Sequence, residues 1–431
     1  MKKPLSFLLL ILIYSLGQAQ TTEIEVALSK LPGVSFQTVQ KNSRYQVYQL
    51  LVRQPLDHSD TTKGYFFQKV YLSHKGFDAH TVMVTEGYNA DQHRLSELTG
   101  FLDANQVQVE HRFFGESMPV RPDYKLLNLK QATADLHRIK QLLASVYRKK
   151  WISTGISKGG ATTIFYRYFY PDDVDVSVPY VAPINQAYEE PRIYHFLDTV
   201  GNQACRDKIK AYQTQVLKNR DEILPLIKFY SLGAGAVYSY LSLEEAFEFA
   251  VMEYPFSFWQ WGSSCENIPS SSATVEELTE YLLAESNPSF FGDAAIEYYG
   301  SHYYQSATEM GYYGYETSEF KEHLKALPVD RNPMALFFPF DMNEAFDGQL
   351  LKDLNQWLKT EAHQFIYIYG GQDTWSASAV PQNDQVDSEW FMLAGKHHGN
   401  ARISSMNTQE LKRFTETLQK WLSPGFSPAR D

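Results

Sequence analysis

A serine set between glycines is the first feature of the sequence that could do chemistry. Residues 155–159 read Gly-Ile-Ser-Lys-Gly, with Ser157 at the centre, and a third glycine follows at position 160. An apolar run precedes the motif and a segment of small, then aromatic, residues follows it, as in a strand, a sharp turn and a helix. Glycines on both sides of the serine let strand and helix pass closely. The pattern predicts a nucleophilic Ser157, although Gly-x-Ser-x-Gly also occurs by chance in many chains.

Two other residue types could handle the proton of that serine. Asp373 follows the apolar run 365–369 and a pair of glycines, and His397 and His398 follow the apolar run 389–393. A serine needs a base to take its proton, and a carboxylate can fix the tautomer of an imidazole base. We predict Asp373 as the acid and His397 as the base, with His398 as the alternative.

A serine nucleophile also needs donors for the negative charge that develops on the attacked oxygen. The start of a helix offers backbone N–H groups, so the N–H of Lys158 is the first candidate. The second is the loop at Tyr88, which follows an earlier apolar run at 81–85.

The elements that must carry these residues alternate between strand and helix patterns. This order favours parallel strands joined by crossovers, and Ser, Asp and His in that chain order, each at a strand end, is the layout of an α/β hydrolase. Residues 21–50 give little signal. The predicted strands are 65–72, 81–85, 107–110, 150–156, 175–180, 365–369 and 389–393, and helices are expected at 129–147 and 407–422.

The stretch from about 189 to 331 has a different character, with helix-like, aromatic-rich segments separated by turns. We therefore expect a helical cap at 191–331, inserted into a catalytic domain formed by 21–190 and 332–431. Cys205 and Cys265 are the only cysteines, and they fall inside this cap. They could form one disulfide or stay as two buried thiols; the first fits an exported protein.

The N-terminus favours export. Residues 1–20 combine two lysines, an apolar run and small residues before the expected cleavage point, which is typical of a signal peptide. The later sequence contains no apolar run long enough to span a membrane. The chain has 39 basic and 50 acidic residues; without Lys2 and Lys3 the net charge is −13. Such a balance argues against nucleic acid as a partner. We expect a periplasmic or secreted protein with no cofactor and no metal.

Several motifs together resemble a known family. The segments 110–117 (Glu-His-Arg-Phe-Phe-Gly-Glu-Ser) and 129–136, the motif around Ser157, and 370–376 (Gly-Gly-Gln-Asp-Thr-Trp-Ser) look like those of secreted bacterial tripeptidyl aminopeptidases. That family is related to prolyl carboxypeptidase and dipeptidyl peptidase II, which carry a similar Glu-His-Arg-Tyr-Tyr-Gly-Glu-Ser segment. The resemblance covers about residues 65–403. It implies an α/β-hydrolase fold with a helical cap and the roles already given to Ser157, Asp373 and His397.

The resemblance also implies a substrate: a peptide with a free N-terminus, shortened by two or three residues at a time. An ammonium group is held by carboxylates, and Glu86 and Glu110 stand near predicted strand ends. The proline preference of the lysosomal relatives does not carry over, because their motif reads Gly-Gly-Ser-Tyr-Gly. Two other functions fit the same residues: a serine esterase or lipase of this fold, and a non-catalytic binding protein on a hydrolase scaffold.

Overall fold

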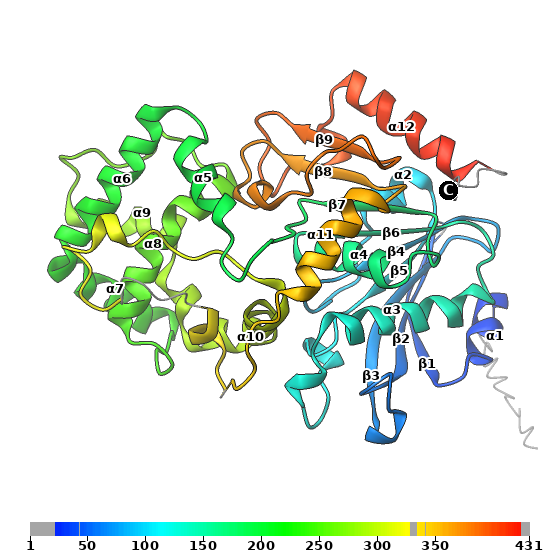
Figure 1. Cartoon of the computed structure of the whole chain (residues 1–431). Helices are drawn as coiled ribbons and strands as arrows, with labels where there is room; N and C mark the ends of the chain where they lie inside the picture. Colours follow the sequence, from blue (N-terminus) through cyan, green and yellow to red (C-terminus); the bar gives the residue numbers. More distant parts are fainter. Residues whose placement is uncertain (1–21, 43, 328–333, 341, 424–431) are drawn as a thin grey trace, which may run out of the picture.

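A mixed nine-stranded sheet forms the centre of the protein (Figure 1). The computed structural model describes residues 22–423 except 43, 328–333 and 341, so the predicted signal peptide at 1–20 lies outside the described residues. The strand order is β1-β2-β3-β5-β4-β6-β7-β8-β9. The strands are β1 (Val34–Lys41), β2 (Gln46–Pro55), β3 (Tyr65–His74), β4 (Thr81–Thr85), β5 (Asn105–Val109), β6 (Trp151–Ile156), β7 (Val176–Tyr180), β8 (Ile366–Gly370) and β9 (Glu389–Leu393).

The sheet is antiparallel at one end and parallel over the rest. The pairs β1–β2, β2–β3 and β3–β5 are antiparallel. From β5 through β4, β6, β7 and β8 to β9 every pair is parallel. The carboxyl ends of β4, β6, β7, β8 and β9 therefore meet at one edge. This mostly parallel sheet, with a Gly-x-Ser-x-Gly turn after β6, confirms the predicted α/β-hydrolase fold.

Helices cover both faces of the sheet, because side chains along each strand alternate between two hydrophobic clusters. In β4, Val82 and Val84 pack into the cluster that contains Phe414 and Trp421, whereas Met83 packs with Ile139 on the opposite face. One face is covered by α2 (Glu97–Leu102) and α12 (Thr408–Leu422). The other is covered by α1 (Glu23–Ser29), α3 (Leu129–Ala144), α4 (Lys158–Phe169) and α11 (Gln349–Thr360).

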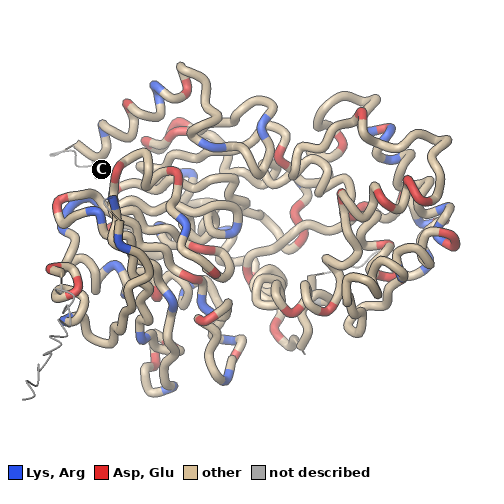
Figure 2. Tube along the Cα trace, turned by 180° about the vertical axis from the view of Figure 1, so that it is seen from behind, with Lys and Arg blue, Asp and Glu red and all other residues tan. Residues whose placement is uncertain are grey.

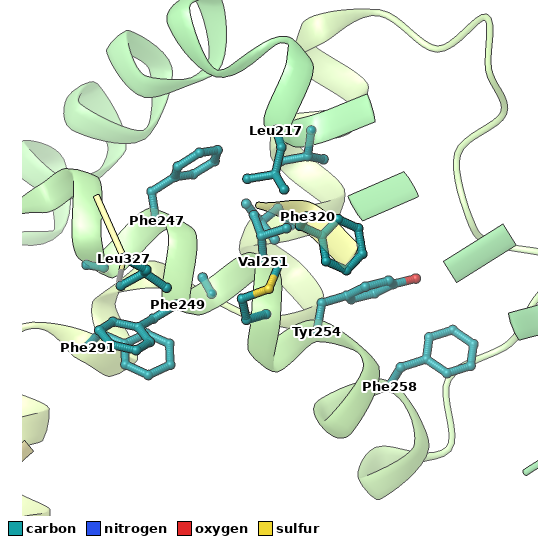
Figure 3. Packing of buried hydrophobic residues seen from close by; sticks show 14 of the residues in the cluster. Leu217, Phe247, Phe249, Val251, Tyr254, Phe258, Phe291, Phe320 and Leu327 are labelled. Carbon is teal, nitrogen blue, oxygen red and sulfur yellow. The ribbon is translucent and has the colours of Figure 1, made fainter. Parts of the chain in front are cut away.

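Between β7 and β8 the chain leaves the sheet and forms a group of helices beside it (Figure 1). They have their own hydrophobic core, seen in Figure 3, in which Phe247, Tyr254 and Phe258 are buried. The same cluster includes Met334 and Phe337, beyond the predicted boundary at 331, so the division at 191–331 stays a prediction. The helices are α5 (Pro191–Thr199), α6 (Gln203–Lys218), α7 (Arg220–Ala234), α8 (Leu243–Trp261), α9 (Val275–Glu285) and α10 (Asp293–Gln305).

One disulfide ties this insertion together. Cys205, near the start of α6, is bonded to Cys265, shortly after the end of α8, with the two Cα atoms 5.5 Å apart. Of the two states that the sequence left open for these cysteines, the disulfide is thus the one present. Among the described residues, no helix has both the length and the apolar character needed to cross a membrane.

Candidate active site

Ser157 lies in a strained turn between β6 and α4. Its φ of 58° and ψ of −127° fall outside the regions that suit an L-residue, at a cost of about 1–3 kcal/mol. The turn is held by the Ser157 N–H, which donates to the Tyr180 carbonyl at 2.9 Å. A Cβ at Gly155 would stand 2.3 Å from the Gly159 carbonyl oxygen, so only glycine lets strand and helix approach this closely. The close approach is the one predicted from the spacing of the glycines.

Asp373 and His398 form a buried pair at the same edge of the sheet. Asp373 follows β8 and His398 follows β9, and Asp373 Oδ2 accepts a hydrogen bond from His398 Nδ1 at 2.8 Å. The side chain of Asp373 is fully buried, and its Oδ1 accepts from the Trp375 N–H at 3.1 Å. Because a carboxylate only accepts, Nδ1 carries a proton in this pair, and in the neutral ring the lone pair therefore stands on Nε2. This is the protonation state that a general base requires.

His397, which we expected to pair with Asp373, points elsewhere. A Cβ added to Gly262 would lie 2.4 Å from His397 Cδ2, so this ring packs on the backbone at the end of α8. Its Nδ1 accepts from the Gly399 N–H at 3.3 Å, and partial burial lowers its pKa. Neighbouring residues in the loop project in different directions, so only His398 reaches Asp373. The choice of His397 is therefore at odds with the geometry, and the alternative, His398, fits it.

The loop after β4 is fixed against the start of α4. A Cβ at Gly87 would lie 2.6 Å from Lys158 Cβ and 2.7 Å from the Gly159 nitrogen, so the loop backbone touches the turn directly. Lys158 Nζ donates to the Gly87 carbonyl at 2.8 Å and to Gln305 Oε1 at 2.9 Å. The Lys158 side chain is buried, and burial lowers its pKa to about 7. The next residue in the loop, Tyr88, is thereby held beside Ser157.

A small cavity opens next to the serine. Its volume is about 20 Å³, room for about one water molecule, and both Ser157 and Lys158 line it. Half of the other lining residues are aromatic, and the wall comes from strand-end loops and from the insertion. Its other lining residues include Tyr88, Pro183, Asn185, His302, Tyr312 and Trp375.

The chain is similar to known peptidases over almost its whole length. The profile of the family described as PS-10 peptidase S37 matches residues 17–430. The chain belongs to this peptidase family. A prolyl tri/tetrapeptidyl aminopeptidase of Streptomyces mobaraensis is 31% identical over 415 residues, covering 94% of this chain and 86% of that protein. The prolyl carboxy peptidase like protein 5 of Caenorhabditis elegans is 23% identical over 422 residues, covering 79% of this chain and 83% of that protein.

The solved structures that resemble this S37 peptidase are more distant. A bromoperoxidase from Bacillus anthracis is 14% identical, with 86% of this chain and 99% of that chain covered and a TM-score of 0.34. A likeness at this level carries no argument about the site.

The S37 peptidase uses Glu110 in a way that differs from our expectation of a substrate contact. Glu110 is fully buried, and its Oε1 accepts from both the N–H and the hydroxyl of Ser117 at 2.8 Å. Its Oε2 accepts from the Ala90 N–H at 2.8 Å and lies 3.4 Å from Lys69 Nζ. With both oxygens occupied, the carboxylate holds two loops together and has no oxygen left for a ligand.

Glu86 remains a prediction. Its Oε1 accepts from Gln108 Nε2 at 2.9 Å, and Gln108 lies on β5, whereas Ser157 follows β6 on the other side of β4. Burial raises the pKa of Glu86, against the smaller opposing effects of Gln108 and Arg94.

Helix α8 of the insertion contacts both loops that carry Asp373 and His398. The carbonyl of Phe256 accepts from Thr374 Oγ1 at 2.9 Å, next to Asp373. The carbonyl of Gln260 accepts from the His398 N–H at 3.0 Å. These two bonds make the last turns of α8 part of the support of the acid–base pair.

Several residues around the pocket escaped sequence reasoning. Trp375 stands two positions after Asp373 and could have been found from that spacing. Asn185 follows β7 in a loop without a motif, and His302 and Tyr312 come from an aromatic-rich stretch of the insertion that has no distinctive pattern. Among the described residues, no group of three or more His, Cys, Asp or Glu side chains is placed to hold a metal ion.

Proposed function

We propose that this S37 peptidase is an exported serine exopeptidase that releases tripeptides or dipeptides from free N-termini. The observation that carries the proposal is the Asp373–His398 hydrogen bond of 2.8 Å at the sheet edge where Ser157 occupies a strained turn. Membership of a peptidase family and the name of the Streptomyces relative support peptide as the substrate.

The proposed chemistry is acyl transfer in two steps. His398 Nε2 takes the proton of Ser157 Oγ as this oxygen attacks the substrate carbonyl, and Asp373 stabilises the imidazolium that forms. The charge on the carbonyl oxygen is received by the N–H of Lys158 and by the loop at Tyr88. His398 then gives its proton to the departing amine, which leaves an ester on Ser157. A water molecule, activated by the same imidazole, hydrolyses the ester and restores the serine.

Recognition of a free N-terminus is supported by the charge of the insertion. Residues 191–331 contain 20 acidic and 10 basic residues, so most of the excess negative charge of the chain lies there. Figure 2 shows acidic positions distributed along these helices. A negative potential beside the pocket raises the local concentration of substrates that carry an ammonium group. Export is supported by the pattern of residues 1–20 and by the disulfide between Cys205 and Cys265.

The test compares two chromogenic tripeptidyl amides that differ only in an N-acetyl group. The unblocked substrate should be cleaved with a kcat/KM at least about 100-fold higher, because acetylation removes the charge that a carboxylate binds. Mass spectrometry of digests from unblocked longer peptides gives the length of the released fragment. The Ser157→Ala variant, which keeps the backbone of the turn, should lose at least about 10⁴-fold in kcat. Equal cleavage of blocked and unblocked substrates would disprove the exopeptidase proposal.

A further inference from the structure

One lysine is buried beside the nucleophile without an acid bonded to it. Lys158 directly follows Ser157, and only 2% of it is exposed. Among the described residues, no carboxylate is hydrogen-bonded to its ammonium group, and Glu309 acts on it only through charge. Burying an ammonium group without an ion pair is costly, so a purely structural role would favour an apolar side chain of similar length. The charge of Lys158 therefore calls for a function.

The ammonium group is held by neutral acceptors and by aromatic rings. Lys158 Nζ donates to the Gly87 carbonyl at 2.8 Å and to Gln305 Oε1 at 2.9 Å. It also lies over the rings of Tyr88 and Phe114, 5.6 Å and 5.5 Å from their centroids. Amide oxygens and ring faces both attract a cation. These contacts join the start of α4 to the loop after β4 and to α10 of the insertion.

The Gly87 carbonyl belongs to the same peptide unit as the Tyr88 N–H. In a planar trans peptide the two groups point in opposite directions, and a cation bound to the oxygen polarises the unit and makes the N–H a stronger donor. Within the described part of the chain, the Tyr88 N–H donates no hydrogen bond. Tyr88 and Ser157 line the same small cavity. A donor that is free to bind an oxygen is thus available beside the serine.

We propose that Lys158 is a positioning residue for the oxyanion: its ammonium group fixes and polarises the peptide unit between Gly87 and Tyr88, whose N–H then binds the oxygen of the attacked carbonyl. The inference rests on the proposed function and assigns an electrostatic role to a side chain that does not itself touch the substrate. A donor strengthened in this way acts mainly in the transition state, where the oxygen carries its charge. The ammonium group should therefore raise kcat and leave substrate binding nearly unchanged.

The charge of Lys158 depends on pH in the neutral range. Burial lowers its pKa to about 7, against the opposing effect of Glu309. Burial raises the pKa of Glu309 itself to about 8. The other titratable groups around the ammonium stay neutral there, because burial lowers the pKa values of His111 and His302 well below the ordinary value and raises the pKa of Tyr88. We therefore expect kcat to fall on the alkaline side as the ammonium group loses its proton.

The first measurement compares Lys158→Met with the wild type on one unblocked tripeptidyl amide. The variant's kcat should fall by about 10- to 100-fold, less than the full loss of an oxyanion donor, while KM stays within about threefold. A peptide aldehyde, whose adduct with Ser157 places its oxygen in the oxyanion site, should bind more weakly by a similar factor. Lys130→Met, which removes an exposed lysine on α3, is the matched control and should keep the wild-type values.

Two variants of nearly unchanged shape separate a charge effect from a structural one. Gln305→Glu keeps the acceptor for Lys158 and adds a negative charge, so the alkaline limb of kcat should move to higher pH by about one to three units. Glu309→Gln keeps the acceptor for the Leu129 N–H and removes a carboxylate that favours the ammonium group, so the limb should move to lower pH. A lysine that only filled space would produce no such opposite shifts.

Each outcome is decisive. An unchanged kcat in Lys158→Met, or an alkaline limb that either charge variant leaves in place, would overturn this inference and leave the peptidase proposal intact. Failure of the wild-type enzyme to cleave any unblocked peptide would overturn the proposed function, and the inference with it. If Lys158→Met does not fold, as judged by loss of a cooperative thermal transition, the pH profiles of the wild type and the two charge variants decide.

Discussion

The sheet edge and the helical insertion contribute to the site in different ways. Ser157, Asp373 and His398 each follow a strand of the parallel sheet, where the ends of neighbouring strands bring distant residues together. The insertion supplies the carbonyls of Phe256 and Gln260, which bind the two loops, and the side chains that close the pocket. The three residues proposed to react thus depend on the sheet, whereas two hydrogen bonds that hold their loops and part of the pocket wall come from the insertion.

One buried carboxylate from each region shows a second difference. At the sheet edge, Asp373 is fully buried and accepts a hydrogen bond from the imidazole of His398. In the insertion, Glu253 is 5% exposed and accepts hydrogen bonds from the hydroxyls of Ser257, Tyr313 and Tyr315. Burial raises the pKa of Glu253 to about 7, whereas the hydroxyls lower it. Substitutions in each region can therefore probe its contribution separately.

The largest expected effect separates the two adjacent histidines at the sheet edge. His398→Ala should lower kcat by at least about 10³-fold, because it removes the imidazole bonded to Asp373. His397→Ala should stay within about tenfold of the wild type, because that ring packs on Gly262 and not on the acid. Steady-state kinetics on one unblocked peptide measures both, with thermal unfolding as the control for folding. An equal loss in both variants would contradict the assignment of His398.

This pair of histidines also marks the limit of what the sequence could predict. The strands at 81–85 and 389–393 were placed correctly, because their apolar residues are continuous and turn residues bound them. In a loop no such periodicity exists, so nothing in the sequence decides which of two neighbouring side chains turns towards Asp373. That choice depends on the end of α8, where Gly262 leaves room for the ring of His397.

Other features depend on long-range packing and could not be predicted from the sequence. Strands β1 and β2 lie mostly in a region that gave little signal, since β1 is mostly exposed and its apolar alternation ends after Phe36. Glu110 seemed available for substrate because nothing in the sequence shows that its carboxylate bonds to Ser117, seven residues on, and to Ala90 in another loop. Asn185 reaches the pocket only because Met310 and Gly311, more than 100 residues away in the chain, bind its amide.

A second expected effect concerns the stability of the insertion. The disulfide closes a loop of 60 residues, and loss of such a crosslink lowers the free energy of unfolding by about 4 kcal/mol. The double variant Cys205→Ser/Cys265→Ser should show this loss in urea denaturation. Hydrogen exchange should rise more in α6 and α8 than in β4 and β6, because Cys265 follows α8 closely. Wild-type protein in reductant should match the variant, and reductant should not change the variant. An equal rise of hydrogen exchange in α6 and α8 and in β4 and β6 would show that the disulfide does not stabilise the insertion more than the sheet.

The smallest expected effect is the dependence of insertion stability on pH. Because Glu253 has a pKa of about 7 in the folded protein and 4.5 as its ordinary value, the folded state binds the proton more tightly. Its contribution to stability is complete below pH 4.5 and is lost as the pH rises through 7, a change of about 3 kcal/mol. Glu253→Gln lacks this titration. Its free energy of unfolding should therefore rise relative to that of the wild type by about 3 kcal/mol between pH 4.5 and pH 8.

The measurement is the difference in the free energy of unfolding between wild type and Glu253→Gln across that range. Taking a difference cancels the contributions of other buried acids, such as Glu309, whose pKa is raised to about 8 by burial. Glu244→Gln changes an exposed carboxylate on the same helix and should show no such trend. A flat difference for Glu253→Gln would mean that this carboxylate is as well stabilised in the charged form as in water.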